Sequence, residues 1–326
     1  MFPDVDAARA LLARHFGPTP LVPARSLSTP GGDVFLKVET GLPTGSFKVR
    51  GAIYSLSVNA SRRTIREVVA ASTGNHGAAV AYAGTLLGIA ATIYLPAAPN
   101  PVKAARIREL GARIVEGGAD LSAAIDAAAE YCERAPAGSD RFFLHDANDA
   151  DIPAGAGSIG AEIVEQLPGV DAIYVPMGDT ALIRGVASAA KHLKPSVRIV
   201  GVAARNAPAY EQSWRSGAAI ETAPVDTIAD GLAGGRALLP NVAAIRALVD
   251  DVQLVSEEEM LAAIGWLMDR EQVIAEPAGA AATAAYMKES TRRESGAPHG
   301  RGVSVLLVTG CNIAPQVAAS VPRLAT

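Results

Sequence analysis

The feature of this sequence that most constrains its fold is the alternation of short apolar segments with stretches of helical pattern. Strands are expected at 33–38, 68–71, 92–95, 113–116, 172–175, 198–202 and 303–308. Helices are expected at 4–14, 79–83, 103–110, 121–134 and 257–270, the last with Ser256 as its N-cap. This alternation predicts an α/β protein whose twisted, parallel-rich sheets are flanked by helices.

The chain of 326 residues is long enough to form two lobes. Residues 51–144 contain a self-contained set of strand–helix units. We therefore expect a small domain over 51–144, inserted in a large domain made of 1–50 and 145–326. The charged stretch 290–302, which contains Pro and Gly, predicts a solvated loop.

Charge and composition disfavour several classes of protein. The formal net charge is −4 and no basic patch with interleaved aromatic residues occurs, so nucleic acid is not an expected partner. The two cysteines, Cys132 and Cys311, form no disulfide framework, and the histidines show no zinc spacing. The apolar stretch 84–96 is too short to span a membrane, and 4–14 is amphipathic, unlike a signal peptide. We expect a cytoplasmic protein without a membrane partner.

Lys48 stands at the centre of the segment Pro-Thr-Gly-Ser-Phe-Lys-Val-Arg-Gly-Ala, at the start of an expected helix. A lysine amine that condenses with an aldehyde must lose its proton, and a partly apolar, partly cationic site lowers its pKa for that purpose. Arg50 adds a second positive charge two residues later. The alternative interpretation is an ordinary surface lysine near a helix start.

Residues 71–78, Ala-Ser-Thr-Gly-Asn-His-Gly-Ala, link an apolar strand to a helix. Several backbone N–H groups at a helix N-terminus form a ready site for a carboxylate. Asn75 can bond a phenolic oxygen. Alternatively, Ser72 or Thr73 is only an N-cap and His76 only a loop histidine.

Residues 174–185 and 306–312 contain two further strand-end motifs. In the first, a strand enters the small-residue turn Met-Gly-Asp-Thr-Ala, where the backbone can approach a phosphate closely; the alternative is an aspartate N-cap. In the second, the strand ends in Thr309-Gly310, and a threonine hydroxyl can bond a pyridine nitrogen without giving it a proton. A strand that ends in Thr-Gly is also common without any function.

Together these motifs resemble, over nearly the whole chain, the fold-type II (tryptophan synthase β-like) pyridoxal phosphate enzymes, and most of all the threonine and serine dehydratases and serine racemases. The segments 227–232, 276–280 and 309–312 follow in the family's order. The resemblance implies pyridoxal 5'-phosphate as cofactor. It also implies an amino acid as the small-molecule substrate, and a homodimer.

The resemblance also implies roles for individual residues. Lys48 would hold the cofactor as a Schiff base and later move protons at the substrate α-carbon. Phe47 and Gly231 would lie on opposite faces of the ring, with Asn75 at its phenolic oxygen and Thr309 at its nitrogen. The phosphate would be held by Gly178, Asp179, Thr180, Ala181 and Leu182. The substrate carboxylate would be held by Ser72, Thr73, Gly74, Asn75 and His76. Glu276 matches a family glutamate near the ring, without a definite role.

Three positions depart from the family. Asp179 is acidic where a phosphate is expected, so it must point away or be neutralised, with Arg184 as the candidate counter-charge. The racemases and several dehydratases hold a divalent cation just after the next strand, whereas residues 202–209 contain no acid, and we expect no metal there. Thr73 stands where the racemases carry a serine that acts on the opposite face of the α-carbon, which makes it a second catalytic candidate.

These expectations lead to an ammonia-lyase (dehydratase) that converts a β-hydroxy α-amino acid such as threonine or serine to a 2-oxo acid and ammonia. One alternative is an amino-acid racemase. Another is a dehydratase of a larger hydroxylated diamino acid in hydroxyectoine breakdown, which the Gly-Asp-Thr-Ala turn resembles. A non-catalytic binding protein is disfavoured by the presence of Lys48. Because the chain stops shortly after the Thr309 strand, we expect no regulatory domain there.

Overall fold

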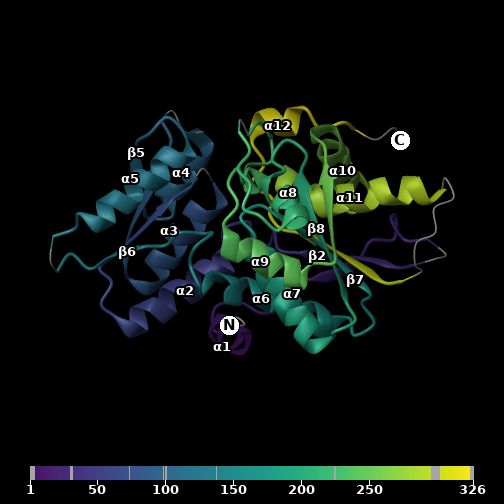
Figure 1. Ribbon diagram of the computed structural model, residues 1–326, viewed down its shortest axis with the longest axis horizontal. Coiled ribbons are helices and arrows are strands. Elements are labelled where there is room, and N and C mark those ends of the chain that lie inside the picture. The colour runs from purple at the N-terminus through teal and green to yellow at the C-terminus, as the bar shows by residue number, and fades with distance from the viewer. Residues whose placement is uncertain are drawn as a thin grey trace.

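The computed structural model describes residues 4–29, 32–72, 74–97, 99, 101–136, 138–223, 225–294 and 302–323, and places them in two sheets with flanking helices (Figure 1). The large sheet has the order β1-β2-β10-β7-β8-β9, with bounds Leu21–Pro23, Val34–Val38, Ser304–Val308, Ala172–Pro176, Arg198–Ala204 and Asp251–Val255. Only β1 is antiparallel to its neighbour. Parallel pairing brings the carboxyl ends of β2, β10 and β7 to one edge, where ligands bind in open α/β sheets.

The small sheet is wholly parallel. Its order is β5-β4-β3-β6, with bounds Arg113–Glu116, Ala90–Leu95, Glu67–Ala71 and Arg141–Phe143. These strands all fall within 51–144 and those of the large sheet fall outside it. The two sheets therefore use separate parts of the chain, and the inserted domain with its boundaries stays a prediction. The α/β class with parallel-rich sheets is confirmed.

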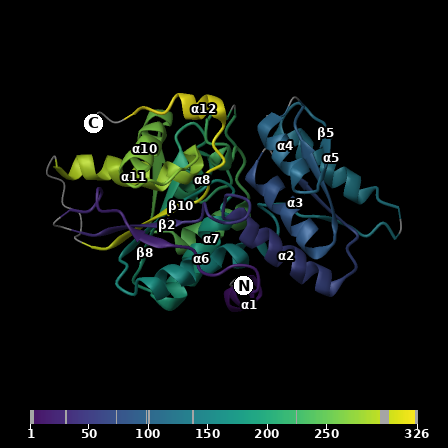
Figure 2. The ribbon, with the colours of Figure 1, turned by 180° about the vertical axis from the view of Figure 1, so that it is seen from behind.

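Helices flank both sheets, as Figures 1 and 2 show from opposite sides. Those at the N-terminus and around the small sheet are α1 Val5–Leu12, α2 Lys48–Arg62, α3 Asn75–Leu87, α4 Pro101–Glu109 and α5 Leu121–Glu133. Those around the large sheet are α6 Ile152–Gln166, α7 Ala181–Leu193, α8 Ala209–Ser216, α9 Leu239–Leu248, α10 Glu257–Arg270, α11 Pro277–Glu294 and α12 Pro315–Ala319. A 3₁₀ turn, η1, spans Asp230–Leu232. In the part of the chain that the structure describes, no helix has the length and apolarity that a membrane crossing requires.

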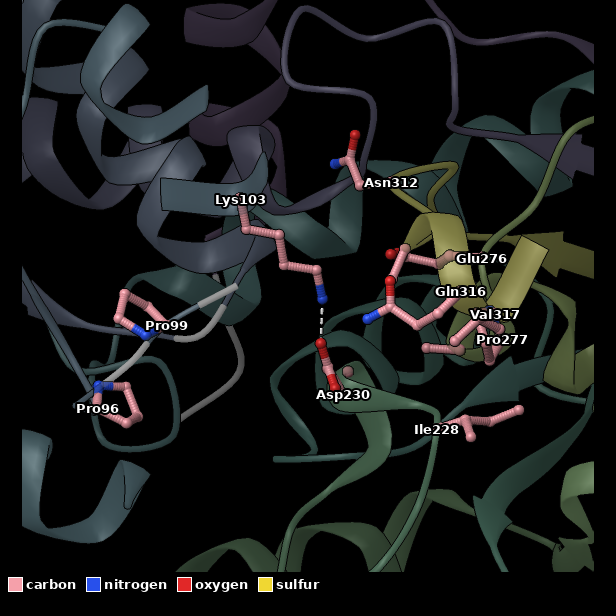
Figure 3. A pocket seen from close by; sticks show the side chains of 13 residues that line it. Pro96, Pro99, Lys103, Ile228, Asp230, Glu276, Pro277, Asn312, Gln316 and Val317 are labelled. Atoms are coloured by element: carbon pink, nitrogen blue, oxygen red, sulfur yellow. Dashed lines mark hydrogen bonds and ion pairs between the residues drawn. The ribbon is translucent and has the colours of Figure 1, made fainter. Parts of the chain in front are cut away.

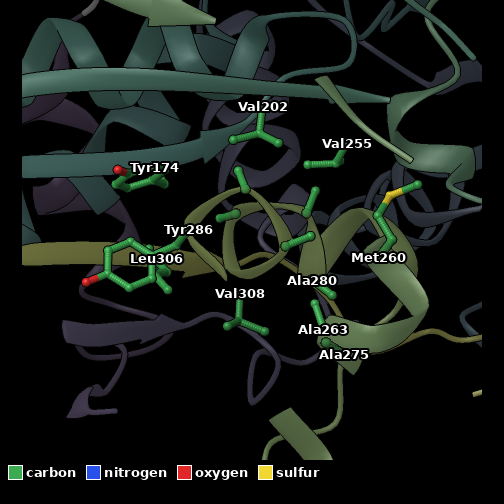
Figure 4. Close-up of a cluster of buried hydrophobic side chains, with 14 of the residues drawn as sticks. Tyr174, Val202, Val255, Met260, Ala263, Ala275, Ala280, Tyr286, Leu306 and Val308 are labelled. Carbon is green, nitrogen blue, oxygen red and sulfur yellow. The ribbon is translucent and has the colours of Figure 1, made fainter. Parts of the chain in front are cut away.

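Side chains alternate across the large sheet and so build two cores. Leu306 and Val308 of β10 join the cluster under α10 and α11, whereas Val305 and Leu307 join the cluster under α6, α7 and α9. Figure 4 shows the first cluster, in which the rings of Tyr174 and Tyr286 meet edge to face with centroids 5.7 Å apart. The alanines of α11 let this helix lie close to the strands.

Several elements agree closely with the sequence expectations. Helix α10 begins and ends where expected, and Ser256 forms a capping box with Glu259. Helix α2 begins at Lys48. The solvated loop expected at 290–302 is wrong over 290–294, because α11 continues to Glu294. Residues 295–301 lie outside the described residues.

A buried ion cluster, formed by Lys37, Glu39, Arg50 and Glu162, joins β2, α2 and α6. Arg50 is 1% exposed and donates to Glu39 at 2.7 Å and to Glu162 at 2.6 Å. Lys37 donates to Glu162 at 2.6 Å. Because two cations face two carboxylates, the cluster is balanced in charge. It fixes the first turn of α2, on which Lys48 lies.

Candidate active site

The Lys48 turn is tied to the end of β10 by backbone contacts. The N–H of Phe47 donates to the carbonyl of Thr309 at 3.0 Å, and Ser46 forms an isolated bridge with Gly310. The segment therefore places Lys48 at the carboxyl edge of the large sheet, beside Thr309. The ammonium of Lys48 lies 5.2 Å from the centroid of the Phe47 ring.

Two carboxylates hold the Lys48 ammonium. It donates to Asp146, in the segment between β6 and α6, and to Asp179 at 2.8 Å. Burial acts to lower the pKa of Lys48, but Asp146 and Asp179 outweigh burial and raise it above its ordinary value. The expectation of a cationic site that lowers this pKa is wrong. Arg50 does not contribute, because it lies in the buried ion cluster.

The expected phosphate turn connects β7 to α7. Thr180 adopts a left-handed conformation at φ 75° just before the helix. A Cβ on Gly178 would lie 2.2 Å from the carbonyl oxygen of Gly231, so the two expected cofactor loops touch through their backbones. The Thr180 hydroxyl and the Arg184 Nε are buried without a hydrogen-bond partner among the described residues. Such polar groups at a helix N-terminus fit a phosphate.

Asp179 does not point away from this turn. Its Oδ1 accepts the N–H of Ala181 at 2.9 Å, and its other oxygen faces Lys48. Arg184 instead donates to the carbonyl of Ala147 at 3.3 Å. The direct ion-pair partner of Asp179 is thus Lys48, and Arg184, the candidate counter-charge, makes no ion pair with Asp179 in the described part of the chain.

Asn75 begins α3 and is held from two sides. It donates to Glu276 at 2.5 Å and accepts from Asn312 at 2.7 Å. Gly74 occupies the N-cap position without a side-chain cap bond, and its N–H donates to the Ser72 hydroxyl at 3.1 Å. Because Gly74 is the N-cap residue of α3, Ser72 is not its N-cap. Thr73 lies outside the described residues, so its expected role stays a prediction.

His76 is buried at 6% exposure in the first turn of α3. Its Nε2 lies 3.0 Å from the carbonyl of Leu144, and its Nδ1 lies 3.5 Å from Asp146. This histidine therefore places the expected substrate loop next to a carboxylate that contacts Lys48.

A cavity of about 390 Å³ opens next to these loops. Its lining includes Gly231, Glu276 and Asn312, and Lys103 of α4 reaches across it to Asp230 of η1 (Figure 3). Burial raises the pKa of Glu276, so this carboxyl holds a proton more readily than an exposed one. The cavity has room for a small polar ligand.

The structure thus brings together most of the predicted residues, and their individual roles stay predictions. Sequence reasoning missed the parts played by Asp146, Asn312, Lys103 and Asp230. Asp146 and Asn312 lie in the segments that follow the carboxyl ends of β6 and β10, and this position was the available signal.

The segment after β8 carries no acid, and Glu211 of α8 pairs with Arg215. Within the described ranges, no three His, Cys, Asp or Glu side chains gather closely enough to hold a metal ion. The expected lack of a metal stays a prediction.

Comparisons with known proteins agree with this geometry. The family model described as "Pyridoxal-phosphate dependent enzyme" matches residues 12–310. L-threonine ammonia-lyase of Thermotoga maritima is 37% identical over 287 residues, which cover 88% of this chain and 71% of that protein. The structure of maize serine racemase superposes with a TM-score of 0.89 at 30% identity, over 98% of this chain and 97% of that one. Threonine deaminase isoform 2 from Solanum lycopersicum superposes with a TM-score of 0.85 at 29% identity, over 98% and 94%.

Proposed function

Because the chain belongs to the pyridoxal-phosphate dependent enzyme family, we propose that it is an ammonia-lyase acting on a β-hydroxy α-amino acid, with L-threonine or L-serine as substrate. The substrate loses its β-hydroxyl and its amine, and the products are a 2-oxo acid and ammonia. The observation that carries the proposal is the placement of Lys48, Thr309, Asn75 and the 178–182 turn around one edge of the large sheet.

Pyridoxal phosphate, when bound, spreads the electron pair left on the substrate α-carbon. Lys48 would hold the cofactor covalently and, once released, take the proton from the α-carbon. The turn at Gly178–Thr180 and the first N–H groups of α7 would hold the phosphate, with the Thr180 hydroxyl and Arg184 as further donors. Asn75, fixed by Glu276 and Asn312, would bond the ring's phenolic oxygen.

The substrate carboxylate would be bound by the turn between β3 and α3. The Ser72 hydroxyl accepts the N–H of Gly74, which shapes this turn, and His76 anchors its far side to the carbonyl of Leu144. The cavity bounded by Lys103 and Asp230 would receive the substrate side chain. Since Thr309 is buried at the end of β10, its hydroxyl suits a ring nitrogen that stays unprotonated.

A second candidate, amino-acid racemase, is favoured by the likeness to maize serine racemase. A β-hydroxyl offers a faster exit for the electron pair than a new proton on the opposite face, so elimination is the expected main reaction. The cytoplasmic location and the homodimer stay predictions.

The experiment is to follow products from L-threonine, L-serine and a panel of larger β-hydroxy amino acids. We expect 2-oxo acid and ammonia in equal amounts, formed much faster than the opposite enantiomer. Chiral chromatography of the serine reaction, beside an ammonia assay, decides between the candidates. If D-serine forms faster than pyruvate, the racemase is the correct assignment.

A further inference from the structure

The segment between β6 and α6 places a carboxylate, Asp146, against the nitrogen of Lys48. We propose that Asp146 is the counter-ion of this nitrogen and sets its protonation and direction. The inference deepens the proposed function and rests on it, since it takes Lys48 to be the lysine that holds the cofactor.

Asp146 lies between the Lys48 ammonium and the His76 ring. One of its oxygens accepts from the Lys48 ammonium, and the other lies 3.5 Å from Nδ1 of His76. The opposite nitrogen of His76 lies 3.0 Å from the carbonyl of Leu144. The ring of His76 is thus positioned by Leu144, with its other nitrogen turned toward Asp146. The side chains of Lys48 and Asp146 are 12% and 18% exposed, so water screens their attraction little.

Asp179 is the other carboxylate at Lys48, and the pKa values of Asp146 and Asp179 are shifted in opposite directions. Burial acts to raise the pKa of Asp146, but His76 and then Lys48 outweigh it and hold this pKa below its ordinary value. Burial, and then the neighbouring Asp146, raise the pKa of Asp179. When two interacting acids share one site, the acid with the lower pKa stays ionised and the acid with the higher pKa takes up a proton first. Here Asp146 has the lowered pKa and Asp179 the raised one.

Position gives the same assignment. Asp179 lies in the turn proposed to hold the phosphate and accepts the N–H of Ala181, so a bound anion there disfavours its charge. Asp146 comes from another segment, and within the described residues it accepts no hydrogen bond from the N–H groups of α7. Asp146 is therefore the carboxylate that stays ionised beside the Lys48 nitrogen.

The other charged groups around Lys48 and Asp146 are His76 from α3, Asp179 and Arg184 from the β7–α7 region, Glu276 before α11, and His145 beside Asp146. Only Asp146 and Asp179 contact the Lys48 ammonium in the described part of the chain. A carboxylate at this distance favours positive charge on the nitrogen, whether it is a free ammonium or an imine that carries a proton.

The first test is a pH titration of the visible absorption of the holoenzyme. In Asp146→Asn, the yellow band of the protonated imine should disappear at a pH lower by about 1 unit or more than in wild type, since one unit is a tenfold change in proton affinity. Asp146→Glu should restore much of the shift. Asp149→Asn is the matched control, because Asp149 lies in the same segment but caps the N–H groups of 151 and 152.

The second test needs no cofactor. Acetylation of the full chain at a series of pH values, followed by peptide mass spectrometry, gives the reactivity midpoint of Lys48 beside that of the surface residue Lys194. The Lys48 midpoint should lie higher, and Asp146→Asn should bring it down toward that of Lys194.

Each outcome is decisive. If the absorption midpoints of folded Asp146→Asn and wild type agree, or if Lys48 in wild type reacts as readily as Lys194, Asp146 is not the counter-ion. If Lys48→Ala still turns yellow with pyridoxal phosphate, the proposed function has the wrong lysine. The acetylation result then still judges the contact between Asp146 and Lys48 on its own.

Discussion

Replacing Arg50 by Ala should lower the free energy of unfolding by about 3–5 kcal/mol, the usual cost of removing one partner from a buried ion pair. The Arg50 guanidinium is 1% exposed and bonds Glu39, Glu162 and Ser158. Without it, two buried carboxylates face Lys37 alone, so the cluster keeps one uncompensated negative charge. Adding Glu162→Gln to Arg50→Ala should recover part of the loss, because that charge is then removed.

The pH dependence of stability has a definite sign. Burial acts to raise the pKa of Glu162, but Arg50 and then Lys37 outweigh it and hold this pKa below the ordinary value of 4.5. The contribution of ionised Glu162 to the free energy of unfolding is therefore fully present above pH 4.5. It is lost as the pH falls through the lowered pKa that Glu162 has in the folded state. In Arg50→Ala this acid-side loss should be smaller, since less of the stabilisation remains to be lost.

Urea unfolding followed by circular dichroism, at neutral and acidic pH, measures both effects. Arg134→Ala is the control, because Arg134 and Glu130 form a surface pair with side chains 80% and 52% exposed. Such a pair contributes about 0–1 kcal/mol. If Arg50→Ala lowers the free energy of unfolding no more than Arg134→Ala does, the buried ion cluster does not stabilise the fold.

Three further predictions concern the site. Gly178→Ala should weaken pyridoxal phosphate binding, because the added Cβ would lie 2.2 Å from a backbone oxygen of η1 and overpacking costs about 1–3 kcal/mol. Gly169→Ala is the control: Gly169 has open space around it, so this variant should bind the cofactor normally in the same absorbance titration. Lys103→Met should raise KM by up to about fivefold with kcat unchanged, since the ion pair of Lys103 with Asp230 is partly exposed and contributes up to about 1 kcal/mol. Arg106→Met, on the same helix, should leave KM unchanged. Mg²⁺, Ca²⁺ and EDTA should leave ammonia release unchanged, and a large reversible loss in EDTA would reveal a metal site.

Local signals in the sequence were enough to predict much of the fold. The Ser-Glu-Glu-Glu start of α10 satisfies its own N–H groups, so its first residue could be placed from sequence. Helix α6 is the opposite case, because its glycines are poor helix formers in isolation. They are favoured only in the folded protein, where α6 lies close against α7: a Cβ on Gly160 would meet the backbone oxygen of Val186 at 2.3 Å.

The sequence did not predict the contacts in the site that join side chains from distant segments. Residues two apart on a helix do not share a face, so Arg50 enters the buried ion cluster while Lys48 faces the site. Asp146 reaches Lys48 because β6 pairs with β3 in the small sheet, and this pairing has no local signature. The sequence could therefore single out Lys48 and Asp179 as site candidates, but it could not show that Asp146 and Asp179 both contact the Lys48 ammonium.

The central claim is that Lys48 holds the cofactor. The most direct measurement is reduction of the yellow protein with sodium borohydride, followed by peptide mass spectrometry. We predict one pyridoxyl phosphate label per chain, on the peptide that contains Lys48, and none in Lys48→Ala. A label on Lys103 or another lysine, or a protein that remains colourless and unlabelled with excess pyridoxal phosphate, would contradict the account.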